Sequence, residues 1–412
     1  MLLVHVSEGK SMLQFIEDIK SQKRPVVIFG AGIVGEVLFW ACQHFKLEVH
    51  SFCDNNVNKT KSTLCGIDVI LTSELSAKHN NPIILISAAD IQDVVLQLQE
   101  LGYEEWYSCA SFLRAFDVFQ YKFSAPSDFA DYAVATAILC HDSYLTPDKL
   151  FLRSVDIVIT ERCSLKCRHC SNLMQYYKHP KDCSMEEVLR DINAFCSVVD
   201  EVNEFRLIGG EPFMNKDFHV ILDRLVNEAK AKKVVIYTNG TIIPQTHQLE
   251  SLKDKKVLVI ITDYGELSRN LQKLLDVLKV NTINFYLHKV EGWTDCASIV
   301  KHARALVQQK ELFRKCCAKN TTTLLGGKLY RCPFAANIHR LGAVLNCKHD
   351  YIDFFKEPQA LEFMKKSIKE YLLQKEFLEI CDYCDGRSFG DAEIAPAAQI
   401  KQPLVCDEIE TF

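Results

Sequence analysis

Three cysteines stand close together in the run Cys163-Ser-Leu-Lys-Cys167-Arg-His-Cys170, which we call the cysteine loop. The loop follows an apolar run, residues 155–160, that predicts a buried strand. Three thiolates on one short loop are soft ligands, which favour iron–sulfur clusters or zinc. A cluster of four irons held by three cysteines keeps one iron without a protein ligand. The pattern therefore predicts a metal centre with an open position that the amine and carboxylate of a small molecule could occupy.

Two further motifs follow the cysteine loop in order. Gly209, Gly210 and Glu211 lie in Arg-Leu-Ile-Gly-Gly-Glu-Pro, and Thr238 and Asn239 end the run Val-Val-Ile-Tyr-Thr-Asn-Gly. Together the three motifs resemble those of the radical S-adenosylmethionine (SAM) enzymes, whose signature is Cys-x3-Cys-x2-Cys after the first strand of a partial (β/α) barrel. The alternative is a zinc knuckle, which needs a fourth ligand that His169, inside the loop, is badly placed to supply.

This resemblance implies a SAM-binding [4Fe-4S] cluster on the cysteine loop and a role for each motif. Gly209 and Gly210 would let the backbone approach SAM, Glu211 would accept its ammonium, and Thr238 and Asn239 would bond its ribose or carboxylate. The reduced cluster would cleave SAM into methionine and a 5′-deoxyadenosyl radical, which abstracts hydrogen from a small-molecule substrate. The resemblance thus implies an oxidoreductase-type enzyme with an electron donor such as flavodoxin or ferredoxin.

Apolar runs alternate with helical patterns over residues 151–310, which predicts a parallel sheet and, with the resemblance, a partial (β/α)6 barrel. In such barrels the active site lies at the carboxyl ends of the strands. The cysteine loop and both later motifs fall at such ends. Other candidates near late strand ends are Asp263, Tyr264, Arg269, His288, Glu291 and Asp295, with an exposed helix position as the alternative for Arg269.

Residues 311–412 carry a second set of cysteines, Cys317, Cys332, Cys381 and Cys384. The pattern Cys-x9-Gly-x4-Cys with a later Cys-x2-Cys resembles the twitch domain, a short relative of the SPASM domain. The resemblance implies a small α+β domain with one auxiliary [4Fe-4S] cluster.

Several features of this second set remain open. Cys316 adjoins Cys317, and because consecutive strand residues point to opposite faces, only one of them is expected to be a ligand. Cys347 and Cys406 are reserve ligands, and zinc is the alternative metal. Residues 321–331 predict a hairpin that turns at Gly326-Gly327 and brings its end cysteines together.

Residues 1–125 predict a Rossmann-like module. A helical connector over residues 126–150 is expected to join it to the barrel that begins at residue 151. An apolar strand runs into Gly30-x-Gly32-x-x-Gly35, a helix follows, and a second strand ends at Asp54. This is the context of a dinucleotide fingerprint, in which Asp54 would hold a ribose. The module also resembles those attached to sugar-modifying enzymes, so the alternatives are a nucleotide, a nucleotide-sugar, NAD or no ligand.

The bulk composition narrows the function further. The chain has 412 residues, a net charge of −5 and 48% apolar residues, with no basic block that predicts nucleic-acid binding. We expect no signal peptide and no membrane span. Eighteen cysteines without a secretion signal favour metal ligation in a reducing cytoplasm. Three functions compete: an enzyme acting on a sugar or nucleotide-sugar, a peptide- or protein-modifying enzyme, and a non-catalytic electron carrier.

Overall fold

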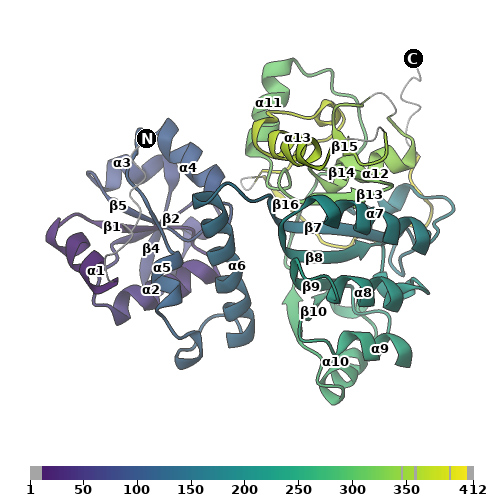
Figure 1. Cartoon of the computed structure of the whole chain (residues 1–412), viewed down its shortest axis with the longest axis horizontal. Coiled ribbons are helices and arrows are strands. Elements are labelled where there is room, and N and C mark those ends of the chain that lie inside the picture. Colours follow the sequence, from purple (N-terminus) through teal and green to yellow (C-terminus); the bar gives the residue numbers. More distant parts are fainter. Residues whose placement is uncertain (1–11, 345–346, 357–359, 389–390, 406–412) are drawn as a thin grey trace. The chain divides into compact units, whose positions relative to one another are not determined.

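The computed structural model describes residues 12–344, 347–356, 360–388 and 391–405. The chain divides into two compact units, Met1–Lys149 and Leu150–Phe412. Each unit has a largely parallel sheet with helices beside it (Figure 1). The predicted α/β class is therefore confirmed.

The first unit has a six-stranded sheet of order β3-β4-β2-β1-β5-β6, in which only the β3–β4 pair is antiparallel. The chain leaves β1 for β2 on one side and later returns to β5 on the other, which makes the β1 end a switch point between crossovers. The elements are α1 Met12–Ser21, β1 Val26–Phe29, α2 Ile33–His44, β2 Ser51–Asp54, β3 Thr63–Leu64, β4 Ile67–Leu71, α3 Leu75–Lys78, β5 Ile83–Ile86, α4 Ile91–Glu100, β6 Tyr107–Ser108, α5 Ala110–Arg114 and α6 Ser127–Leu145.

The second unit is built on an eight-stranded sheet of order β11-β10-β9-β8-β7-β13-β14-β15. Five parallel strands, β7 to β11, follow one another in the chain, with α7 to α10 as crossovers. Apolar side chains such as Phe205, Phe195 and Ile221 form one core between sheet and helices (Figure 1). The elements up to residue 294 are β7 Phe151–Thr160, α7 Met185–Val198, β8 Glu201–Gly209, α8 Phe218–Val226, β9 Ala231–Thr238, α9 Thr246–Leu252, β10 Val257–Asp263, α10 Leu271–Val280, β11 Phe285–Lys289 and β12 Trp293–Thr294.

The predicted hairpin over 321–331 is confirmed. Strands β13 and β14 pair antiparallel, and Leu325 faces Lys328 across a two-residue turn. Gly326 and Gly327 have φ of 59° and 73°, which is the left-handed backbone that such a turn requires. The elements of this region are α11 Leu306–Lys315, β13 Thr322–Leu325, β14 Lys328–Tyr330, α12 Pro333–Leu341, β15 Tyr351–Asp353, α13 Leu361–Gln374 and β16 Glu393–Ile394.

The structure groups these elements differently from the predicted domain boundaries. Strand β13 pairs in parallel with β7, with Thr322 opposite Val155, so residues on both sides of position 310 share one sheet. The sixth parallel strand beside β7–β11 is thus β13, which comes from the C-terminal region. Helix α6, expected as a connector, packs against α2, α4 and α5 of the first unit.

Candidate functional site

Two residues separate the end of β7 from the cysteine loop, and the loop lies against the ends of β8 and β9. Gly210 N donates to Thr160 O at 2.9 Å, and Glu211 N donates to Arg162 O at 2.8 Å. Asn239 Nδ2 lies 3.6 Å from Cys163 Sγ and 3.2 Å from Ser164 Oγ. The structure therefore brings together the three motifs that the sequence placed at strand ends.

Gly209 and Gly210 allow the end of β8 to press against the start of the cysteine loop. A Cβ on Gly209 would lie 2.2 Å from Thr160 O, and one on Gly210 would lie 2.1 Å from Arg162 O. Both contacts are with backbone, which cannot rotate away. The two glycines are thus required by the packing of this chain, whatever they do for a ligand.

We expect Gly210→Ala to lower the iron content of the reconstituted protein and to destabilise the second unit by about 1–3 kcal/mol, as overpacking does. The added methyl must push Arg162 and the adjacent Cys163 away from β8. Iron analysis and denaturant unfolding measure the two effects.

Gly32→Ala is the matched control, because Gly32 has an extended backbone and its Cβ would meet only Lys59 Nζ at 4.0 Å. Full iron and unchanged stability in Gly210→Ala would show that the loop tolerates the displacement and would refute this prediction.

Glu211 is completely buried and holds the end of β9 in place. Its Oε1 accepts from Thr238 Oγ1 at 2.9 Å, and its Oε2 accepts from Asn239 N at 2.9 Å. Burial raises the pKa of this carboxyl to about 7, although these hydrogen bonds lower it. The structure thus assigns Glu211 the task of positioning Thr238 and Asn239.

The three thiols of the cysteine loop influence one another and one tyrosine. Burial raises the pKa of the Cys163 thiol, and Cys170 and Cys167 raise it further. Burial raises the pKa of Cys167 to about 11, and burial also raises that of Cys170. Tyr264, after β10, has a pKa raised first by burial and then by all three thiols, so it faces the loop.

This donor set fits a metal cluster. The three soft thiols lie within electrostatic reach of one another, and burial keeps them protonated unless a cation is present. A bound metal supplies that positive charge and deprotonates a coordinating thiol. Cys163, Cys167 and Cys170 are therefore the residues that would hold a [4Fe-4S] cluster.

The remaining late-strand candidates have different surroundings. His169 Nδ1 lies 2.9 Å from Asp295 Oδ2, which ties the cysteine loop to the segment after β12. Arg269, His288 and Glu291 are exposed. Gly265 N donates to Asp263 Oδ1 at 2.8 Å, so this carboxylate shapes the turn before Tyr264.

A buried polar cluster, which the sequence motifs did not reveal, lies on the face of the sheet opposite α7 and α8. Arg206 Nε donates to Asp156 Oδ1 at 2.5 Å, and its guanidinium lies 5.8 Å from the Tyr237 ring centre. Burial raises the pKa of nearby Glu204 to about 7, and Arg206 lowers it. These residues alternate with the apolar core positions Phe205 and Leu207, and charge inside a buried strand was the signal available in the sequence.

The second set of cysteines gathers around α12 and the 3-10 turn Glu379–Asp382. Cys332 is the N-cap of α12, and its Sγ accepts from Ala335 N at 3.4 Å. Arg304 Nη1 binds the carbonyl oxygens of Cys381 and Cys384 at 2.9 and 2.8 Å. These contacts fix the cysteines on three separate elements.

Cys316, and not Cys317, has a resolved electrostatic influence on the other three cysteines of this set. Burial raises the pKa of Cys332, Cys381 and Cys384, and Cys316 raises each of the three further. Cys317 instead donates its N–H to Arg387 O at 2.8 Å. The reserve Cys347 is buried and also neighbours Asp350 and Glu379, whereas Cys406 lies outside the described residues.

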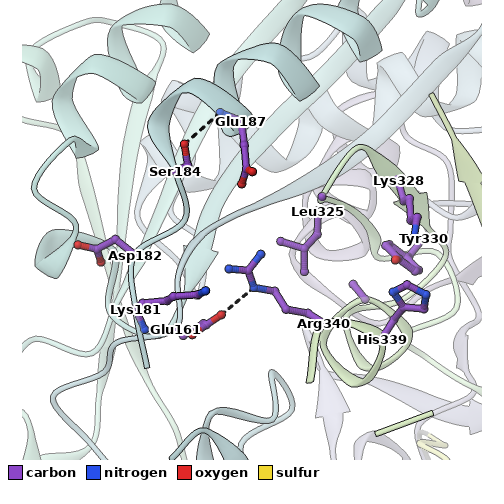
Figure 2. A pocket seen from close by; sticks show the side chains of 12 residues that line it. Glu161, Lys181, Asp182, Ser184, Glu187, Leu325, Lys328, Tyr330, His339 and Arg340 are labelled. Carbon is purple, nitrogen blue, oxygen red and sulfur yellow. Dashed lines mark hydrogen bonds and ion pairs between the residues drawn. The ribbon is translucent and has the colours of Figure 1, made fainter. Parts of the chain in front are cut away.

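A cavity of about 570 Å³ opens between Glu161 just after β7, the start of α7, the β13–β14 hairpin and α12. Figure 2 shows Arg340 pointing toward Glu161, with its Nε 2.7 Å from Glu161 Oε1. Glu161 Oε2 also accepts from Lys181 N at 3.0 Å. Because Arg340 lies on α12, this ion pair links the start of the cysteine loop to the helix that begins after Cys332.

In the first unit, several residues that the sequence predicted as a nucleotide site make contacts within the protein itself. A Cβ on Gly35 would lie 2.0 Å from Gly30 O, so the turn needs glycine there. Asp54 Oδ2 accepts from Ala31 N and from Lys59 Nζ, each at 2.8 Å. Gly32 is the N-cap of α2 and has open space beside it.

Two kinds of feature are absent from the described residues. No three His, Cys, Asp or Glu side chains there lie close enough together to hold a single metal ion. Within the same ranges, no helix has both the length and the apolar character of a transmembrane span.

Comparison with known proteins bears on the second unit. A family model described as the Radical SAM superfamily matches residues 157–276, from within β7 to within α10. A GTP 3′,8-cyclase of Stenotrophomonas maltophilia is 32% identical over 88 residues, which are 21% of this chain and 26% of the relative. One from Clostridium acetobutylicum is 25% identical over 146 residues, 31% of this chain and 45% of the relative. The chain thus spans between about a quarter and a half of these relatives.

Solved structures give looser matches. The structure of BtrN in complex with AdoMet and 2-DOIA has 13% identity and a TM-score of 0.38, and the match covers 61% of this chain and all of BtrN. Streptococcus suis SuiB bound to S-adenosylmethionine has 13% identity and a TM-score of 0.31, with 66% and 77% of the two chains covered.

Proposed function

We propose that the chain is a radical SAM enzyme that cleaves SAM reductively at the cysteine loop. The observation that carries this proposal is the contact of Cys163 and the segment before it with Gly209-Gly-Glu211 and Thr238-Asn239 at the strand ends of the matched residues. When bound, the cluster supplies one electron to SAM, and the resulting 5′-deoxyadenosyl radical abstracts hydrogen from a substrate.

The chain's own residues orient the reactants and keep water out. Cys163, Cys167 and Cys170 would hold the cluster, and three protein ligands for four irons would allow SAM to bind it. Glu211 accepts hydrogen bonds from Thr238 and Asn239, and these two residues would bond the ribose or carboxylate of SAM. Tyr264, at the end of β10, is partly buried and lies within electrostatic reach of all three thiols, so it would help to keep water from the cluster.

The polar cluster of Asp156, Arg206, Glu204 and Tyr237 supports a polar substrate, and we favour a sugar or nucleotide-sugar. Hydroxyl groups can exchange hydrogen bonds with a carboxylate, a guanidinium and a phenol. The curated relatives are named for a reaction of GTP, which also combines a sugar with a base and phosphates. The glycine turn before α2 is a second place for a nucleotide, a nucleotide-sugar or NAD.

The second set of cysteines supports an auxiliary [4Fe-4S] cluster held by Cys316, Cys332, Cys381 and Cys384. Hydrogen abstraction leaves a substrate radical, and its oxidation requires an electron acceptor. An auxiliary cluster would accept that electron, and a flavodoxin or ferredoxin would supply the electron for the first step. Every cysteine in the described ranges is a free thiol, which supports a reducing cytoplasm.

SAM cleavage tests the proposal. We expect the anaerobically reconstituted chain to form 5′-deoxyadenosine and methionine when a low-potential reductant is added, and none when the reductant is omitted. Nucleotide-sugars or nucleotides should raise the rate more than short peptides do. A chain with full iron that forms no 5′-deoxyadenosine under any condition would be an electron carrier, and stimulation by peptides alone would exclude the sugar substrate.

A further inference from the structure

A C-terminal segment, residues 397–404, lies along the cysteine loop more than 200 positions away in the chain. Arg168 N donates to Ala398 O at 2.7 Å, and Ile400 N donates to Lys166 O at 2.8 Å. Cys167 and Gln399 form an antiparallel bridge between these bonds. We call this segment the strap. Its pairing brings backbone and side-chain donors to the face of the loop that β8 and β9 do not contact.

The side chain of Gln399 contacts the cysteine loop at both ends of its amide. Oε1 accepts from Lys166 N at 2.8 Å, and Nε2 donates to Cys167 Sγ at 3.3 Å and to Ala397 O at 2.7 Å. A backbone N–H can only donate and a backbone carbonyl can only accept, so the two partners fix which end of the amide is oxygen. The N–H group must therefore face the sulfur.

The hydrogen bond from Gln399 differs from those of the other two thiols in origin. Cys163 Sγ accepts a hydrogen bond from Asn239 Nδ2 at the end of β9. The Cys170 thiolate is favoured by backbone hydrogen bonds from Asn172 and Met174, just after the loop. Cys167 receives its side-chain bond from the strap. Cys167 is also partly exposed, so the strap limits the access of water to this sulfur.

We propose that Gln399 is a positioning residue that raises the reduction potential of the cluster held by the cysteine loop. This inference rests on the proposed function of that loop. Reduction adds negative charge to the cluster and its sulfur ligands. A hydrogen bond to sulfur stabilises the reduced form more than the oxidised form, and hydrogen bonds and solvent exposure are two of the factors that set such potentials.

The test is a redox titration of the full chain, reconstituted anaerobically and monitored by electron paramagnetic resonance. The signal that changes when SAM is added identifies the cluster of the cysteine loop. We expect Gln399→Leu to keep its iron and to lower the equilibrium constant for one-electron reduction by between threefold and tenfold. A tenfold change corresponds to about 59 mV for a one-electron couple.

Gln402→Leu is the matched control, because Gln402 lies exposed on the same strap. It should titrate as the wild type does. If Gln399→Leu loses the cluster, Gln399→Glu decides, since it keeps the acceptor for Lys166 N, removes the donor to sulfur and adds a negative charge that disfavours reduction in the same direction. We expect Gln399→Glu to lower the potential too.

A wild-type potential in either variant that keeps its iron would overturn the proposal. Loss of iron from both variants would also overturn it, because Gln399 would then hold the loop rather than tune it. A wild-type protein without iron would instead refute the proposed function itself, and the iron analysis that precedes the titration separates the two failures.

Discussion

The variant in which Cys163, Cys167 and Cys170 are all alanine is expected to keep about half of the wild-type iron and sulfide and to lose SAM cleavage completely. Each four-iron cluster contributes equally to the metal content, so removal of one of two clusters halves it. The remaining iron would be held by Cys316, Cys332, Cys381 and Cys384. Metal and sulfide analysis after anaerobic reconstitution measures this ratio.

Cys196→Ala is the control, because Cys196 is a buried core residue of α7 and should keep all of the iron. A triple variant without any iron would show that residues 311–412 carry no iron cluster. The electron-acceptor role would then be lost, and a redox-neutral radical reaction would become the better account of the chemistry. Retained SAM cleavage in the triple variant would contradict the assignment of the loop.

The second large effect is expected from a matched pair of neighbouring substitutions. Cys316→Ala should remove the auxiliary cluster, whereas Cys317→Ala should leave it in place. The reason is that Cys316 raises the pKa of Cys332, Cys381 and Cys384, which indicates that it lies near them. The Cys317 N–H is instead hydrogen-bonded to Arg387 O. The two variants change the same side chain one residue apart, so differences in overall folding are minimised.

Iron content and absorbance of the reconstituted proteins distinguish these outcomes. The opposite result, with iron lost only from Cys317→Ala, would return the ligand to Cys317, the cysteine named in the sequence analysis. Full iron in both variants would mean that neither cysteine is a ligand. Cys347, which lies close to Asp350 and Glu379, would then become the candidate.

Local patterns in the sequence predicted much of the second unit. The apolar run ending at Thr160 and the Gly326-Gly327 turn each act within a few residues, and each is seen in the structure. The cysteine loop was found by spacing alone. Such signals are readable because the backbone conformation they require depends on near neighbours.

Long-range contacts were not predictable in the same way. The pairing of Cys167 with Gln399 and of β13 with β7 joins residues far apart, and neither strand carries a mark that names its partner. The choice between Cys316 and Cys317 likewise depends on where Arg387 lies. The hydrogen bonds that Glu211 accepts from Thr238 and Asn239 were not predicted for a related reason. The complete burial of this side chain follows from the packing of three strand ends.

The parallel pairing of β13 with β7 bears on whether residues 150–310 could fold alone without aggregating. Without β13, strand β7 would be an edge strand whose backbone N–H and C=O groups seek another chain, and such edges promote association. Residues 150–310 alone would therefore carry an unprotected edge next to the cysteine loop. The C-terminal quarter of the chain shields that edge and would also supply ligands, so a loss of cluster chemistry in a truncated chain would not by itself reveal which of these two tasks had failed.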